Sequence, residues 1–143
     1  MAKVKVVYWS GTGNTEAMAN AIGEGIVAGG AEADVKSVSN ATVEELVSEN
    51  VFALGCSSMG DEVLEETEME PFVEELEKSV AGKKIALFGS YGWGDGQWMR
   101  DWQKRMADAG AEVVDGEGLI CNEYPDDDAL AKCKALGQNL AVM

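Results

Sequence analysis

Apolar residues in this chain gather in short runs that are separated by longer segments with helical periodicity. Mainly apolar runs, of the kind that is buried on both faces of a parallel sheet, lie at residues 4–9, 51–56 and 85–90. Residues 33–38 alternate between apolar and polar side chains, which predicts a strand at or near a sheet edge. A last strand is predicted over residues 112–122, with an interruption around residues 115–118.

Helices are predicted between these strands. Apolar residues recur every three or four positions at residues 15–27, 71–80, 97–109 and from residue 126 almost to residue 143. A shorter helical turn through Leu46 is capped by residues 40–42, and the glycine pair 29–30 ends the first helix. Trp98 and Trp102 stand four residues apart on the third long helix, and we interpret them as core residues rather than ligand contacts.

The alternation of strand and helix predicts one doubly wound α/β domain over residues 1–143, a three-layer sandwich with a five-stranded, mainly parallel sheet. Right-handed crossovers leave few topologies, and we expect the strand order 2-1-3-4-5. Polar loops that contain glycine follow the first, third and fourth strands, so all of them should lie at the carboxyl end of the sheet. In this order the first two loops flank the switch point, where such folds bind ligands.

The first of these loops, residues 10–15, reads Ser-Gly-Thr-Gly-Asn-Thr and joins a strand to a helix. It offers unpaired backbone N–H groups and the positive end of a helix dipole, which predicts a phosphate site. The loop lacks the Lys-Ser/Thr pair of a Walker sequence, and Glu16 stands where a dinucleotide fingerprint has its third glycine. Residues 8–10 contain no acid, which argues against a phosphorelay receiver domain. Neutral donors of this kind suit a phosphate monoester.

Charge narrows the classes of partner. The chain has 26 acidic and 11 basic residues and a net charge of −15, which disfavours nucleic acid and anionic membranes and favours basic protein partners. No apolar run approaches the roughly 20 residues of a membrane helix. The N-terminal residues do not have the pattern of a signal peptide, so we expect a cytoplasmic protein.

Composition also limits the chemistry that side chains can perform. Histidine is absent, which removes the commonest general base and the commonest metal ligand. Cys56, Cys121 and Cys133 are far apart and form no Cys-x-x-Cys pair, so we interpret them as small buried residues. We therefore expect no catalytic side chains and no metal site, and any chemistry to come from a bound organic cofactor.

The three loops together are similar to those of a known family. They read Tyr-Trp-Ser-Gly-Thr-Gly-Asn-Thr-Glu at residues 8–16, Gly-Cys-Ser-Ser-Met-Gly-Asp-Glu at 55–62 and Phe-Gly-Ser-Tyr-Gly-Trp-Gly-Asp-Gly at 88–96. Over essentially its whole length the chain resembles the short-chain flavodoxins of anaerobic bacteria. The resemblance implies non-covalently bound FMN, used through its semiquinone/hydroquinone couple, in a low-potential one-electron carrier without a substrate of its own.

The resemblance also implies which residues contact FMN. The phosphate would be held by the first loop, with Ser57 assisting, through Ser10, Gly11, Thr12, Gly13, Asn14 and Thr15. Met59 would lie against one face of the flavin ring and Trp93 would stack on the other. The pyrimidine half would meet Glu62 and the backbone of Ser90, Tyr91 and Gly92, while Asn122 would contact the ribityl chain. The remaining implied contacts are Ser58, Gly60, Asp61 and Gly94.

Two further expectations concern the redox steps. In this family the peptide after Gly60 rotates on uptake of one electron and one proton, so that the Gly60 carbonyl accepts a hydrogen bond from flavin N5. The negative charges of Asp61, Glu62, Glu65, Glu66 and Glu68 would disfavour the anionic hydroquinone and lower the second potential. An alternative for the acidic run at residues 65–70 is a solvated loop without a redox role.

Alternative functions of the same fold remain open at this point. An FMN-dependent quinone or azo reductase would need an open pocket over the flavin, and Met59 and Trp93 on its two faces leave little room. A third candidate is an FMN domain of a larger reductase. For a carrier, the family implies a monomer whose partners have basic docking surfaces, such as the ferredoxin-type oxidoreductases, hydrogenases and pyridine-nucleotide reductases.

Overall fold

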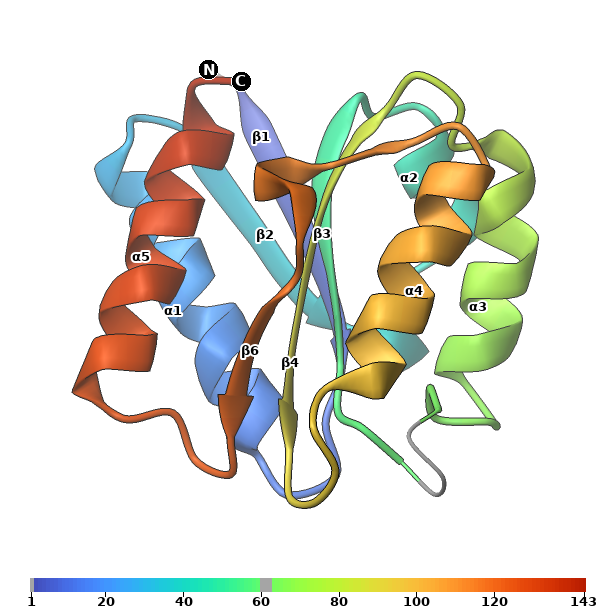
Figure 1. The fold of residues 1–143 in the computed structure, drawn as a ribbon. Coiled ribbons are helices and arrows are strands. Elements are labelled where there is room, and N and C mark those ends of the chain that lie inside the picture. The colour runs from blue at the N-terminus through green and yellow to red at the C-terminus, as the bar shows by residue number, and fades with distance from the viewer. Residues whose placement is uncertain (1, 60–62) are drawn as a thin grey trace.

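A computed structural model describes residues 2–59 and 63–143, and it confirms the alternation of strands and helices (Figure 1). The strands are β1 (Lys3–Trp9), β2 (Glu32–Ser37), β3 (Val51–Cys56), β4 (Lys84–Tyr91), β5 (Glu112–Val113) and β6 (Leu119–Asn122). The α-helices are α1 (Asn14–Ala28), α2 (Val43–Val47), α3 (Met69–Leu76), α4 (Gln97–Asp108) and α5 (Asp127–Ala141). Short 3-10 turns are η1 (Val38–Asn40), η2 (Glu77–Ser79) and η3 (Val114–Gly116).

The sheet has the predicted order, β2-β1-β3-β4-β5, and all of its pairings are parallel among the described residues. The expected interruption of the last strand produces two strands, β5 and β6, both of which pair with β4. Between them η3 contains Asp115 at φ 65°, a left-handed turn that re-aims the chain. The described residues therefore form a six-stranded sheet rather than the expected five-stranded one.

Helices cover both faces of the sheet, with α1 and α5 on one face and α2, α3 and α4 on the other (Figure 1). Successive residues of β4 alternate between the two cores: Ile85 packs toward α3 and α4, and Ala86 packs toward α1 and α5. Trp98 and Trp102 are buried in the α3 and α4 core, as predicted. No helix in the described part of the chain is long and apolar enough to cross a bilayer.

Close packing of α1 against α5 holds the helix that follows the first loop. A Cβ atom on Gly25 would lie 2.0 Å from the Lys134 carbonyl oxygen, and one on Gly137 would lie 2.1 Å from that of Ile22. The two helix backbones therefore touch at positions that only glycine can occupy. This contact fixes the axis of α1 relative to the sheet.

The helix ends follow the sequence signals closely. Thr42 and Glu45 form a capping box at the start of α2, and the Asp126 carboxylate accepts a hydrogen bond from the Ala129 N–H at the start of α5. The helix predicted over residues 71–80 begins earlier, at Met69, and ends at Leu76 before a 3-10 turn. Pro71 still lies in the first turn, where its missing N–H leaves no intrahelical bond unmade.

Candidate functional site

A pocket of about 680 Å³ lies at the carboxyl end of the sheet. Its volume is within the range of roughly 300–1,000 Å³ that is usual for small-molecule sites. The loops after β1, β3, β4 and β6 line it with Trp9, Gly11, Thr12, Asn14, Ser57, Ser58, Met59, Ser90, Tyr91, Gly92, Trp93, Glu123 and Tyr124. Among these described residues none is Lys or Arg, so neutral groups would have to hold an anion here.

The first loop turns sharply into α1. Gly13 has φ 94°, a left-handed conformation that glycine adopts without strain, and its N–H donates to Ser10 Oγ at 3.1 Å. No side chain in the described part of the chain caps α1. The first-turn N–H groups and the helix dipole are thus available to an anion, as the sequence predicts.

The Thr15 side chain, in the first turn of α1, joins three segments of the chain. It is completely buried, and its Oγ1 lies 2.7 Å from Ser57 Oγ in the loop after β3. The same atom accepts a hydrogen bond from the Ser90 N–H, at the end of β4, at 3.2 Å. The Ser58 N–H in turn donates to the Ser90 carbonyl oxygen at 3.0 Å. These bonds hold the start of α1, the loop after β3 and the end of β4 together at the pocket.

A fourth wall comes from the segment after β6. Ser90 Oγ donates to the Glu123 carbonyl oxygen at 2.5 Å, and the Glu123 N–H donates to the Tyr91 carbonyl oxygen at 2.7 Å. Glu123 has φ 59°, which is a left-handed conformation that a non-glycine residue rarely adopts. This turn brings Tyr124, whose side chain is 64% exposed, to the pocket.

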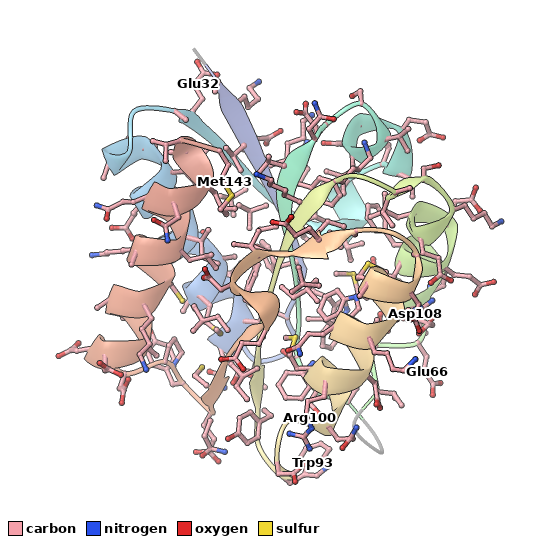
Figure 2. All side chains as sticks on the ribbon, turned by 45° about the horizontal axis from the view of Figure 1, so that its top comes forward. Glu32, Glu66, Trp93, Arg100, Asp108 and Met143 are labelled. Carbon is pink, nitrogen blue, oxygen red and sulfur yellow. The ribbon has the colours of Figure 1, made fainter. Side chains whose placement is uncertain are left out.

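Met59 and Trp93 line the pocket from different loops. Met59 forms a reciprocal pair of backbone hydrogen bonds with Val63, each of 2.9 Å. Trp93 is 56% exposed, in contrast to the buried tryptophans of α4. Figure 2 shows Trp93 at the loop end of the molecule, with Glu32 and Met143 at the opposite end.

The predicted contact residues fall into four groups. Those that line the pocket are Gly11, Thr12, Asn14, Ser57, Ser58, Met59, Ser90, Tyr91, Gly92 and Trp93. Three others form hydrogen bonds next to the pocket: Ser10, Gly13 and Thr15. Two do not line the pocket: Gly94 and Asn122. The Asn122 side chain instead donates to the Tyr91 carbonyl oxygen at 3.3 Å. Gly60, Asp61 and Glu62 lie outside the described residues, and the expectations for them stay predictions.

Sequence reasoning missed three lining residues, Trp9, Glu123 and Tyr124. Trp9 ends β1 and was assigned only to that strand. Glu123 and Tyr124 directly follow β6, which pairs with β4 and so ends at the same edge of the sheet. Their position after a strand end was a usable signal, since it is the signal that identified the other loops.

The acidic run after Met59 is not simply a solvated loop. Glu65 is buried, and its carboxylate accepts hydrogen bonds from Thr67, Glu68 and Met69. Burial raises the pKa of the Glu65 carboxyl, but these hydrogen bonds outweigh burial and hold the pKa below its usual range. Glu70 forms a bidentate ion pair with Arg105 of α4 at 2.7 and 2.9 Å. The solvated-loop alternative is therefore wrong for Glu65 and Glu70, whereas Glu66 and Glu68 are exposed.

We predict that Thr15→Val lowers the free energy of unfolding of the cofactor-free protein by about 1–3 kcal/mol, because the buried Ser90 N–H loses its acceptor. Denaturant unfolding measures the loss, and amide exchange at Ser90 locates it. Thr15→Ser is the matched control, because it removes only a methyl group, worth roughly 0.8 kcal/mol, and keeps the hydroxyl. Amide exchange at Ser90 should stay slow in this variant. Equal Ser90 exchange in both variants would contradict the assigned bond.

Comparison with known proteins gives a consistent result. A family model described as Flavodoxin matches residues 6–137. The chain is 51% identical to a flavodoxin of Clostridium beijerinckii over 96% of this chain and 99% of that protein. It is 46% identical to a flavodoxin of Megasphaera elsdenii over 96% of this chain and 98% of that protein.

Comparison with solved structures indicates the same family as comparison of the sequences. The solution structure of two-electron reduced Megasphaera elsdenii flavodoxin matches this structure with a TM-score of 0.89, at 46% identity, over 98% of this chain and 99% of that one. The polar loops at the carboxyl end of the sheet, the neutral cradle at the start of α1 and these likenesses agree. The chain belongs to the flavodoxin family, whose members are electron carriers that bind FMN.

Proposed function

We propose that the pocket at the carboxyl end of the sheet is the FMN site, with the phosphate at residues 10–15 and the flavin ring between Met59 and Trp93. The observation that carries this proposal is the placement of an uncharged, donor-rich loop at the start of α1 in one pocket with those two side chains. Bound FMN supplies one-electron chemistry. The protein's own residues bind it, orient it and limit the access of water.

The residues present fit FMN in two respects. A phosphate monoester can be held by the hydroxyl, amide and backbone N–H donors of the first loop and by the dipole of α1, without a cation. Ser58 lines the pocket, and its buried Oγ has no hydrogen-bond partner in the described part of the chain. A buried hydroxyl without a partner is costly, and rotation of this side chain toward the pocket would let a polar ligand atom satisfy it.

The exposed aromatic side chains favour a carrier over an enzyme with its own substrate. Trp93 and Tyr124 stand at the pocket with more than half of their surface open to solvent, so a partner protein could approach them closely. The close relatives are flavodoxins, which are electron-transfer proteins. The alternative of a quinone or azo reductase is therefore not favoured.

We predict that the purified protein binds equimolar FMN and that Ser58→Ala separates stability from affinity. The substitution should leave the unfolding free energy of the cofactor-free protein unchanged or raise it by up to about 1–2 kcal/mol, because an unpaired buried group is removed. It should weaken FMN binding about three- to tenfold through the loss of one hydrogen bond. Ser79→Ala, an exposed serine remote from the pocket, is the control. Unchanged affinity in Ser58→Ala would refute the proposed contact.

Negative charge at the pocket would set a low potential. Glu123 lines the pocket, and Glu66 and Glu68 are exposed on the loop that leads from Met59 to α3. One negative charge about 10 Å from a developing charge costs roughly 0.4–1.7 kcal/mol at effective dielectric constants of about 20–80. On the scale where ~1.4 kcal/mol is ~59 mV, this is about 20–70 mV for each acid.

We predict that Glu123→Gln raises the potential of the reduction step that adds negative charge by about 20–70 mV. Gln keeps the size of the side chain and leaves the backbone turn at φ 59° in place. Glu32→Gln, at the opposite end of the molecule in Figure 2, removes the same charge and should leave the potential almost unchanged because salt screens it. A redox titration of both variants checks this, and a lower potential in Glu123→Gln would contradict it.

The protein works with redox partner proteins, and we propose that these dock through basic surfaces. The net charge of −15 supports electrostatic steering of such partners. The cytoplasmic location and the monomeric state expected from the sequence stay predictions.

We predict that the rate of electron transfer from the reduced protein to a basic redox protein falls about tenfold or more as ionic strength rises. Stopped-flow kinetics over a salt series measures the effect. An uncharged small-molecule acceptor should show little salt dependence and serves as the control. A flat profile with the basic protein would contradict electrostatic docking.

A further inference from the structure

Glu65 stands apart from the other acids of the chain. Glu65 is only 7% exposed, and it is the one buried carboxylate among the described residues. It follows the pocket loop by six positions and precedes α3. An ionised carboxyl group in such a place is costly unless hydrogen bonds compensate it.

Hydrogen-bond donors surround both oxygens of the carboxylate. Oε1 accepts from the backbone N–H of Glu68 at 2.7 Å and of Met69 at 3.0 Å. Oε2 accepts from the Thr67 N–H at 2.8 Å and from the Thr67 hydroxyl. These bonds satisfy N–H groups at the start of α3, where the helix dipole also favours a negative charge.

The backbone groups of Glu65 form hydrogen bonds with residues on both sides of it in the sequence. Its N–H donates to Cys56 Sγ, at the end of β3, at 3.5 Å, and its carbonyl oxygen accepts from the Glu70 N–H in α3 at 2.8 Å. Glu65 therefore ties the end of β3 to the first turn of α3. Met59 and Val63 also bond to each other, and Leu64, between Val63 and Glu65, is buried in the core.

We propose that Glu65 is a positioning residue for the cofactor site: it fixes residues 63–65 beside the end of β3, so that Met59, which bonds to Val63, forms one wall of the pocket before FMN arrives. This inference rests on the proposed assignment of that wall to FMN. If Met59 is already in place, FMN binding does not have to include the loss of conformational entropy that ordering this side of the pocket would cause. The competing explanation is that Glu65 only caps α3 and contributes to stability alone.

Glu65→Gln separates the two explanations, with Glu66→Gln as a matched control. Both variants lose one negative charge, but Glu66 is exposed and lies on the α3 side of the molecule in Figure 2. Gln has a single acceptor oxygen, so donors that face the second oxygen of Glu65 meet an NH2 group instead. The readouts are amide exchange at Met59 and Val63 in the cofactor-free protein, and the Kd for FMN.

We expect Glu65→Gln to speed exchange at Met59 and Val63 about tenfold or more and to weaken FMN binding about tenfold, the scale of a lost charged hydrogen bond. Glu66→Gln should change the exchange rates by less than about twofold and should weaken FMN binding not at all, because it breaks no hydrogen bond near Met59. Thr67→Val keeps the carboxylate and removes only the hydroxyl donor, so it should give a smaller change in the same direction even if Glu65→Gln folds poorly.

The proposal is overturned if Glu65→Gln lowers global stability while exchange at Met59 and Val63 and the FMN affinity match those of Glu66→Gln. It is likewise overturned if Thr67→Val leaves both local readouts unchanged. Met59→Ala tests the underlying assignment separately. Unchanged FMN affinity in that variant would reject the Met59 wall, whereas the exchange measurements, made without FMN, report on Glu65 alone.

Discussion

The pocket depends on the buried hydroxyl group of Thr15. Parallel strands end together at one edge of the sheet, and their last backbone groups have no further ladder to join. Thr15 sits in the first turn of α1 and yet bonds to Ser57 and to the Ser90 N–H, so one side chain joins the start of α1 to the ends of β3 and β4. The loops in front of it can then expose their own donors to a ligand instead of using them on one another.

The rigidity of this arrangement comes from two different sources on the two sides of the pocket. On the side of the first loop, residues 10–13, α1 is held by backbone contact with α5 at Gly25 and Gly137, so this loop leads into a fixed helix. On the Met59 side, hydrogen bonds hold the segment that precedes α3. They are made by the Glu65 carboxylate and by the backbone pair of Met59 and Val63. A carrier gains from both, because a preorganised polar site need not rearrange as charge moves onto its cofactor.

Local patterns in the sequence were enough for the architecture. Apolar runs located the strands, glycines and capping residues located helix ends, and the position of polar loops after strands pointed to the segments that line the pocket. The features that the sequence did not predict depend on contacts between segments that are distant along the chain. Glu123 enters the pocket because β6 pairs with β4 and a left-handed residue turns the chain, and Asn122 turns toward Tyr91 for the same reason. A run of glutamates looks solvated in sequence, and only the packing of α3 buries Glu65 among donors.

The acidity of the chain therefore has two physical roles within a few residues. Glu65 and Glu70 are committed to the structure: one satisfies the start of α3, and the other joins α3 to α4 through Arg105. Their charges are compensated where they stand, by N–H donors and by a guanidinium group, so they act weakly at a distance. Glu66 and Glu68 are exposed, as is Glu123 at the pocket, so no burial among donors compensates their charges in this way. Net charge alone thus overstates the charge that is free to act at a distance, because the acids that hold the structure together are compensated and the exposed acids are not.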